Sequence, residues 1–168
     1  MKKFKDKKEL REKLKSLFSD EKYSDALSVI IRHQSLVQGD AQLLFDKGLT
    51  IHLSESDDYS VKDVIDCYQQ ALEVDANFLP PRMELAWSLL KQASHTEALE
   101  NFSYILEKLK VIPVIYLDAY EGFLSCTIEL QGKRAARLHC RENKMLLMPQ
   151  KRELWQKLMG SYFHYKQD

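Results

Sequence analysis

Residues 85–105 read LAWSLLKQASHTEALENFSYI, and this stretch decides the fold. Apolar residues recur at spacings of three and four on both sides of a polar break at 92–94, which is the pattern of two amphipathic helices. Ser94 is followed three residues later by Glu97, a capping box that places the start of the second helix. The stretch is therefore predicted to form a helical hairpin.

The same hairpin pattern recurs along the chain at a regular spacing. Moving back 34 residues from Phe102 reaches Tyr68, and moving back 38 residues from Ala86 reaches Gly48, because the earlier unit has a connection four residues longer. A further step of 34 residues from Gly48 reaches Leu14. The sequence therefore predicts three successive hairpins, at about 4–40, 41–76 and 77–112.

The stretches KQASHTEAL at 91–99 and YQQALEVD at 68–75 resemble the tetratricopeptide repeat (TPR) family. The resemblance implies an all-α fold, a right-handed superhelical stack of antiparallel helix hairpins (a TPR-like α-solenoid). In such a stack, small residues such as Gly48 mark the close approach of two helices. Tyr68 and Phe102 would fill the space between layers.

Beyond residue 112 the repeat pattern weakens. Two amphipathic segments separated by Gln131 and Gly132 predict a degenerate fourth hairpin over 113–148. The apolar residues of the last segment predict a capping helix over 150–166, because a stack of hairpins leaves an apolar face at its end. All four prolines fall at predicted helix boundaries. Residues 1–168 are thus predicted to form a single TPR-like domain.

Composition sets the class of protein. With 168 residues, only 5 Gly and only 4 Pro, the chain has little material for the many tight turns of an all-β fold. Its 25 basic and 25 acidic residues cancel, which argues against binding nucleic acid by bulk charge. No apolar run has the length of a membrane span or a signal peptide, and three widely spaced cysteines are typical of reduced thiols. We therefore expect a cytoplasmic protein that does not insert into a membrane.

No stretch of the sequence carries a catalytic motif. His139 and Cys140 are adjacent, but neighbouring residues on a helix point about 100° apart, and no second ligand pair stands at metal spacing. The acidic residues of 55–66 lack the alternating ligands and central glycine of a calcium loop. The sequence therefore predicts no enzyme activity, no cofactor, no metal and no small-molecule substrate.

In the TPR family the first helices of successive units line a concave groove that binds partners. Carried over by register, the resemblance implies these partner-binding residues: Arg11, Lys15, Phe45, Leu49, Met83, Trp87 and Leu90. Further groove positions are Lys8, Phe18, Gln42 and His52. Desolvated aromatic and Met side chains contribute much of the energy of an interface. The alternative is that the apolar members pack in the core or lie under the C-terminal helix.

Family members that bind the acidic C-termini of heat-shock chaperones use Lys, Arg and Asn at set groove positions. Arg11 fits that pattern, but Lys15 and Asp46 stand where Asn is expected. Pro80 and Glu84 stand where the later Lys and Arg are expected. The sequence therefore argues against a chaperone-tail adaptor.

Charge is unevenly distributed despite the zero total. Residues 54–75 hold seven acids and one base, and residues 131–152 hold seven bases and one acid. A stripe along one helix face contains Lys133, Arg137, Arg141 and Lys144. Three interpretations stay open, namely a solvated face, a site for an acidic protein and, least favoured because no aromatic residues are interleaved, a nucleic-acid site.

The sequence thus predicts a non-catalytic protein–protein interaction module that binds a peptide or protein partner through its groove. The alternative is a dedicated neutralising or chaperone partner of one client, such as a bacterial toxin immunity protein or a secretion chaperone. A nucleic-acid binder is the third and weakest hypothesis.

Overall fold

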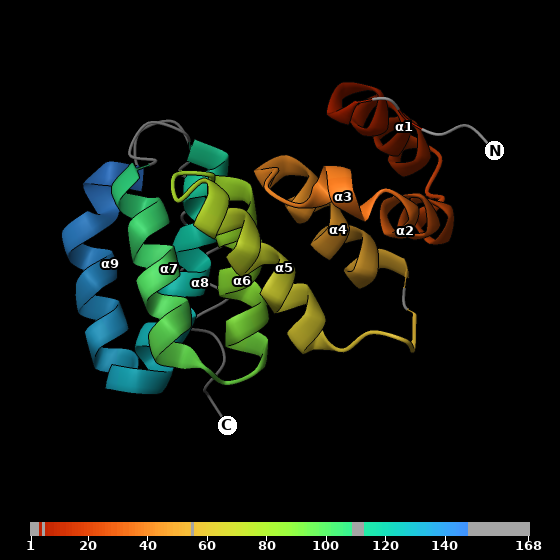
Figure 1. Ribbon diagram of the computed structural model, residues 1–168. Coiled ribbons are helices and arrows are strands. Elements are labelled where there is room, and N and C mark those ends of the chain that lie inside the picture. The colour runs from red at the N-terminus through yellow and green to blue at the C-terminus, as the bar shows by residue number, and fades with distance from the viewer. Residues whose placement is uncertain (1–3, 5, 55, 109–112, 148–168) are drawn as a thin grey trace. The chain divides into compact units, whose positions relative to one another are not determined.

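The computed structural model describes residues 4, 6–54, 56–108 and 113–147, without the side chains of 113–116 and 143–147. Every regular element in these residues is helical (Figure 1). The helices are α1 (Lys7–Ser19), α2 (Tyr23–Arg32), α3 (Gln34–Val37), α4 (Ala41–Ser54), α5 (Val61–Val74), α6 (Leu79–Lys91), α7 (His95–Lys108), α8 (Pro113–Gln131) and α9 (Lys133–Leu147).

The chain divides into two compact units, Met1–Ser88 and Leu89–Asp168. In the first unit, α1 packs on α2, α2 packs on α4, and α4 packs on α5. In the second unit, α7 packs on α8 and α8 packs on α9. Within each unit these helices therefore pack on helices that are near them in the chain, and the single-domain organisation of the whole chain stays a prediction.

The core of the first unit is built from the apolar faces of its helices. Leu10, Leu14 and Ile30 have exposed fractions of 0–1% and lie in one cluster with other buried residues of α1–α5. Burying a side chain of this size stabilises the fold by about 1.5–3 kcal/mol. Leu14, which the repeat pattern aligned with Gly48, is thus a core residue of the first hairpin.

Two glycines allow an aromatic ring to lie directly on a helix backbone. A Cβ at Gly48 would meet the Tyr68 ring at 2.6 Å, and a Cβ at Gly122 would overlap the Phe102 ring. Tyr68 and Phe102 are both completely buried. The predicted role of these two rings as fillers between helices is therefore confirmed in each unit.

Helix boundaries follow local signals. Ser60 and Asp63 form a reciprocal capping box at the start of α5, and Ser94 directly precedes α7. Gly132 adopts a left-handed φ of 84° between α8 and α9, where the sequence predicted a break. Helices α8 and α9 lie in the span of the predicted fourth hairpin, while the predicted capping helix over 150–166 lies outside the described residues.

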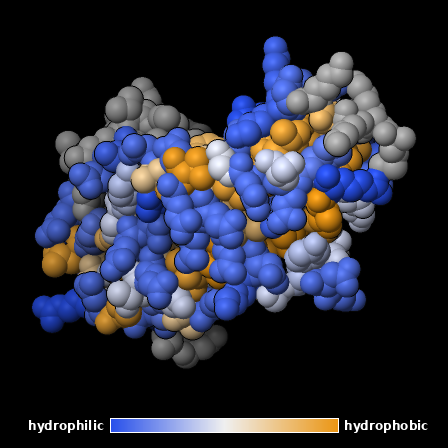
Figure 2. Space-filling view, viewed as in Figure 1, coloured by the Kyte–Doolittle hydropathy of each residue, from blue (hydrophilic) through white to orange (hydrophobic). Residues whose placement is uncertain are grey.

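On the face drawn in Figure 2, hydrophilic residues cover most of the described surface, with hydrophobic residues visible between them. The exposed large hydrophobic side chains are Ile31, Leu53, Val61, Val74, Leu130 and Leu138. No helix within the described residues is long and apolar enough to cross a membrane.

Candidate functional site

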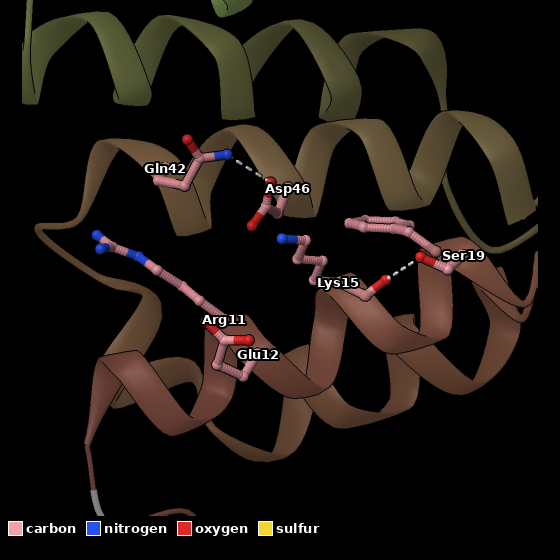
Figure 3. A pocket seen from close by; sticks show the side chains of 7 residues that line it. Arg11, Glu12, Lys15, Ser19, Gln42 and Asp46 are labelled. Carbon is pink, nitrogen blue, oxygen red and sulfur yellow. Dashed lines mark hydrogen bonds between the residues drawn. The ribbon is translucent and has the colours of Figure 1, made fainter.

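A hollow of about 490 Å³ opens between α1 and α4 within the first unit (Figure 3). Volumes of this order are typical of small-ligand and side-chain pockets. The hollow is lined by Arg11, Glu12, Lys15, Phe18, Ser19, Gln42 and Asp46. It therefore brings together four of the residues that the resemblance placed in the groove, from two successive hairpins.

Helical spacing explains why these side chains converge. Arg11, Lys15 and Phe18 are four and three residues apart, so they share one face of α1. Gln42 and Asp46 are four residues apart and share one face of α4. In Figure 3 the two sets point toward one another across the hollow, with the Lys15 side chain directed at Asp46.

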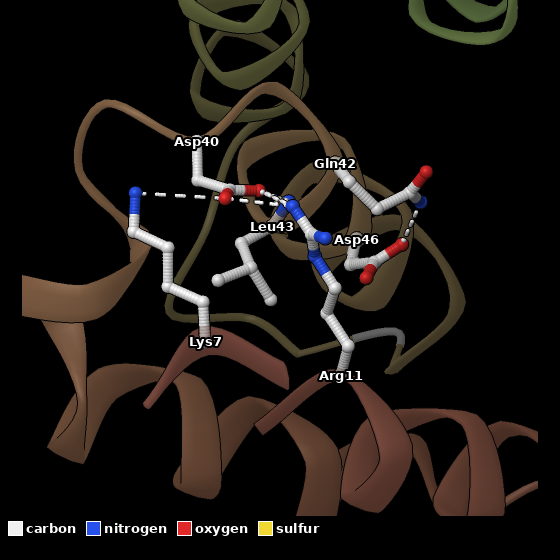
Figure 4. A network of polar contacts seen from close by, with 6 residues as sticks. All are labelled: Lys7, Arg11, Asp40, Gln42, Leu43 and Asp46. Carbon is white, nitrogen blue, oxygen red and sulfur yellow. Dashed lines mark hydrogen bonds and ion pairs between the residues drawn. The ribbon is translucent and has the colours of Figure 1, made fainter. Parts of the chain in front are cut away.

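An ion-pair network holds α1 against the start of α4 beside the hollow (Figure 4). The Arg11 guanidinium donates to both oxygens of Asp40, at 2.6 and 2.7 Å, and the Lys7 ammonium lies 3.5 Å from Asp40 Oδ2. Asp40 Oδ1 also accepts a hydrogen bond from the Leu43 amide in the first turn of α4, at 3.1 Å. Asp40 therefore caps α4 and bridges it to α1.

The charge state of Asp40 follows from these contacts. Burial alone would raise its pKa, but the hydrogen bonds from Arg11 and from the Leu43 amide, with the charges of Arg11 and Lys7, lower it below the usual value. Asp40 is thus ionised at neutral pH. Its negative charge is paired with Arg11, and Lys15 is the other cationic side chain that lines the hollow.

Asp46 lines the hollow and is unusual because its carboxylate is buried. Its exposed fraction is 9%, and burial raises its pKa to about 6, even though the hydrogen bond from Gln42 and the charge of Arg11 act to lower the pKa. Gln42 Nε2 donates to Asp46 Oδ1 at 2.8 Å. A carboxylate that is buried with a single hydrogen-bonding side chain costs folding free energy, and such groups cluster at functional sites.

The other predicted groove residues lie on α4 and α6. Phe45 is half-buried, with its ring centroid 5.8 Å from those of Tyr68 and Phe78, and Leu49 lies one turn further along α4, also half-buried. Met83 is buried at 9% exposure. Trp87 and Leu90 are half-buried on α6. None of these five lines the hollow, and neither do the predicted groove residues Lys8 and His52, so the role of all seven in binding stays a prediction.

The predicted basic stripe lies on α9. Lys133, Arg137 and Arg141 are exposed, together with Arg134 on the same helix, and Lys144 follows one turn later. The stripe belongs to the second unit and the hollow to the first.

The adjacent pair His139 and Cys140 packs against α8. Tyr120 Oη lies 2.8 Å from His139 Nδ1, and the Phe123 ring centroid lies 4.5 Å from that of His139. Burial lowers the pKa of His139 and raises the pKa of Cys140. Both shifts favour the uncharged forms, as expected for groups that stabilise the contact of two helices.

The remaining thiols have the same character. Cys67 and Cys126 are buried, and burial raises the pKa of Cys67 and raises that of Cys126 to about 11. A thiol in such surroundings is a poor nucleophile at neutral pH. Within the part of the chain that the structure describes, no three His, Cys, Asp or Glu side chains are placed to hold a metal ion.

Comparison with solved structures finds two crystal structures of MamA, each with a TM-score of 0.65. One is 13% identical and covers 94% of this chain and 81% of that chain, and the other is 14% identical and covers 95% and 77%. MamA is a TPR-like helical repeat protein. This chain has the same helical-repeat fold. No family model and no curated protein sequence matches the chain.

The predicted all-α, TPR-like α-solenoid class is therefore confirmed at the level of fold. In this fold the hollow lies between the first helices of two successive hairpins, α1 and α4. The predicted groove positions Arg11, Lys15, Phe18 and Gln42 are therefore brought together by the repeat itself.

Three residues that line the hollow were not predicted to bind a partner. Glu12 and Ser19 were not singled out, and Asp46 was noted only as a departure from a clamp pattern. A signal for Asp46 exists in the sequence, because helical spacing places it on one face of α4 with Leu43 and Thr50, and both of these are buried. An acid at such a position is a candidate for a function other than solubility.

Proposed function

We propose that the chain is a non-catalytic protein-interaction module that binds an extended peptide segment of a partner protein along the first helices of its hairpins. The α1–α4 hollow would anchor the segment. The observation that carries the proposal is the convergence of Lys15, Gln42 and Asp46 on one open hollow in a helical-repeat fold.

The chemistry of the hollow suits a peptide. Lys15 and Gln42 supply hydrogen-bond donors, Asp46 and Gln42 supply acceptors, and the half-buried Phe18 ring supplies apolar surface. A peptide backbone needs both donors and acceptors, and its side chains need apolar contact. Arg11 is held by Asp40 and would contribute mainly by fixing the shape of the wall.

The groove is proposed to continue past the hollow along the half-buried Phe45 and Leu49 of α4. Phe45 packs on the core from one side, which would keep its ring rigid while part of it stays accessible. Rigid aromatic side chains lose little conformational entropy on binding. Met83, Trp87 and Leu90 would extend the same surface on α6.

A non-catalytic role is supported by the state of the candidate nucleophiles. The thiols Cys67, Cys126 and Cys140 are buried, with their pKa values raised, and His139 is engaged by Tyr120. None of the four lines the hollow. The hollow offers binding groups rather than an activated nucleophile.

The test is selection from a displayed library of random 12-residue peptides (about the length that spans several helical turns when extended), followed by affinity measurement on variants of α1 and α4. Lys15→Ala and Gln42→Ala are expected to weaken binding of selected peptides at least about tenfold, a loss of about 1.4 kcal/mol. Lys13→Ala is the matched control, since Lys13 is exposed on the same helix and does not line the hollow.

Selected peptides that bind the Lys15→Ala and Lys13→Ala variants equally well would contradict the proposal. The same selection separates the interaction module from the alternative of a neutralising or chaperone partner. If the chain is an interaction module, the selection is expected to enrich a family of related short peptide sequences. A partner dedicated to one client would bind its folded client and enrich no short sequence.

A further inference from the structure

Helix α9 carries an exposed basic face, and we propose that this face binds helix α5 of a second copy of the chain. Arg134, Arg137, Leu138 and Arg141 are exposed, whereas Ala136 and Cys140 of the same helix are buried. The four exposed residues follow spacings of three and four, so they share one side of the helix. One side of α9 thus packs on α8. The opposite side is cationic and surrounds Leu138, which has an exposed fraction of 53%.

Helix α5 presents the complementary charge. Its buried face contains Val64, Tyr68 and Ala71, which pack toward α4. The opposite side carries the exposed Glu73 and the half-buried Asp66. Helical spacing places both carboxylates on one outward stripe. The exposed Lys62 lies one turn before Asp66 on the same side of α5, and Asp63 in the first turn is bonded to Ser60.

The two stripes match in spacing as well as in sign. Arg134 and Arg141 are seven residues apart, as are Asp66 and Glu73, so each pair spans two helical turns, or about 10.5 Å. Arginine forms bidentate pairs with carboxylates, which sets the register of such a contact. Two arginines of one copy can therefore pair with two carboxylates of another when the two helices lie nearly parallel or antiparallel.

The charge balance of the whole chain favours a second copy as the occupant. The net charge is zero, so two copies have no overall repulsion to overcome. Residues 54–75 carry a local charge of −6 and residues 131–152 a local charge of +6, from seven charges of one sign and one of the other in each. Helix α7 also has exposed acids seven residues apart, Glu100 and Glu107, and the same net charge as α5, −2 from three acids and one base in each. The segments that flank the two helices differ, because Asp57, Asp58 and Asp75 flank α5 whereas Lys91 and Lys110 flank α7.

The contact is expected to be weak and sensitive to salt. Each exposed ion pair contributes little to the free energy of association, and the screening length falls from about 10 Å at 0.1 M salt to about 3 Å at 1 M. Because α9 of one copy meets α5 of the next, the contact is head-to-tail. When both such contacts form between the same two chains, the assembly is a closed dimer. When they do not, further copies can add to it.

The experiment measures the mass of the purified full chain by sedimentation at about 0.05 M and about 0.5 M salt, where screening differs several-fold. The wild type is expected to associate with rising concentration at low salt and to dissociate at high salt. Arg134→Glu with Arg141→Glu, and separately Asp66→Lys with Glu73→Lys, are each expected to remain monomeric at low salt. Helical circular dichroism checks that each variant folds.

Mixing the two reversed variants provides the decisive arm, because the acidic α9 of one then faces the basic α5 of the other, and association is expected to return. Gln70→Lys with Glu73→Lys is a second charge-reversed variant of α5. It avoids the half-buried Asp66, because Gln70 and Glu73 are both exposed. Glu100→Lys with Glu107→Lys is the matched control and should associate like the wild type. A wild type that stays monomeric at low salt, or an association that the reversals leave unchanged or that mixing does not restore, overturns the proposal.

Discussion

The guanidinium of Arg11 donates to both carboxylate oxygens of Asp40, although the two residues are 29 positions apart in the chain. This contact joins the first helix of one hairpin to the first helix of the next, and it lies beside the hollow that is the candidate binding site. The geometry of the hollow therefore depends on a polar bridge as well as on the apolar core.

Asp40→Ala is expected to destabilise the fold by about 2 kcal/mol, because the variant loses both the cap of α4 and the charge-assisted pair in which one nitrogen of Arg11 donates to both carboxylate oxygens. Asp40→Ser keeps a capping oxygen and loses only the bridge, so about half of that loss is expected. Chemical denaturation at neutral pH measures both values. Equal stabilities of wild type and Asp40→Ala would show that the bridge contributes nothing.

Asp46→Asn is expected to stabilise the fold at pH 7 by about 1–3 kcal/mol. The folded-state pKa of about 6 lies above the ordinary value of 3.8, so the folded wild type binds more protons than the unfolded chain between about pH 4 and pH 6. Wild-type stability should therefore fall as pH rises through that window, and the variant should lack this slope. Denaturation series at pH 4, 5, 6 and 7 compare them, and parallel curves would refute the assignment.

Gly48→Ala is expected to cost about 1–3 kcal/mol, because the new Cβ would lie 2.6 Å from Tyr68 Cε1 and 3.1 Å from Cys67 Cβ. Tyr68→Leu should open space for that methyl group. In the double variant the cost of Gly48→Ala should therefore shrink, giving a coupling energy that thermal unfolding of the four chains can measure. If the two substitutions change the free energy of unfolding in a strictly additive way, the Tyr68 ring does not restrict the size of the side chain at position 48.

Tyr68→Phe is expected to leave stability unchanged or to raise it by about 1 kcal/mol. The Tyr68 hydroxyl is buried without a hydrogen-bond partner among the residues that the structure describes, and burial raises the pKa of Tyr68. Removing the hydroxyl keeps the ring that fills the space above Gly48. A loss of more than 1 kcal/mol in thermal unfolding would instead reveal that the hydroxyl is bonded.

Periodicity predicted most of the fold because it reports which face of each helix is buried. Leu14, Tyr68 and Phe102 were located by the repeat spacing, and all three are completely buried. The break at Gly132 was readable because glycine tolerates the left-handed φ that the turn requires. The short helix α3 was not predicted, since four residues carry too little periodic signal.

The candidate site was less readable from the sequence. Register placed Arg11, Lys15, Phe18 and Gln42 on facing helices, but it did not reveal that Asp40 engages Arg11 or that Asp46 is buried. Both facts depend on how two helices from different hairpins meet. A repeat pattern records each helix separately, so the pairing between hairpins needs the structure.

The most direct test of the proposed binding site is the backbone amide NMR spectrum of the chain during titration with a selected peptide. The proposal predicts shifts concentrated at Lys15, Phe18, Gln42 and Asp46, on the facing sides of α1 and α4. Smaller shifts should follow at Phe45 and Leu49. Shifts confined to other helices, with α1 and α4 unchanged at saturation, would contradict it.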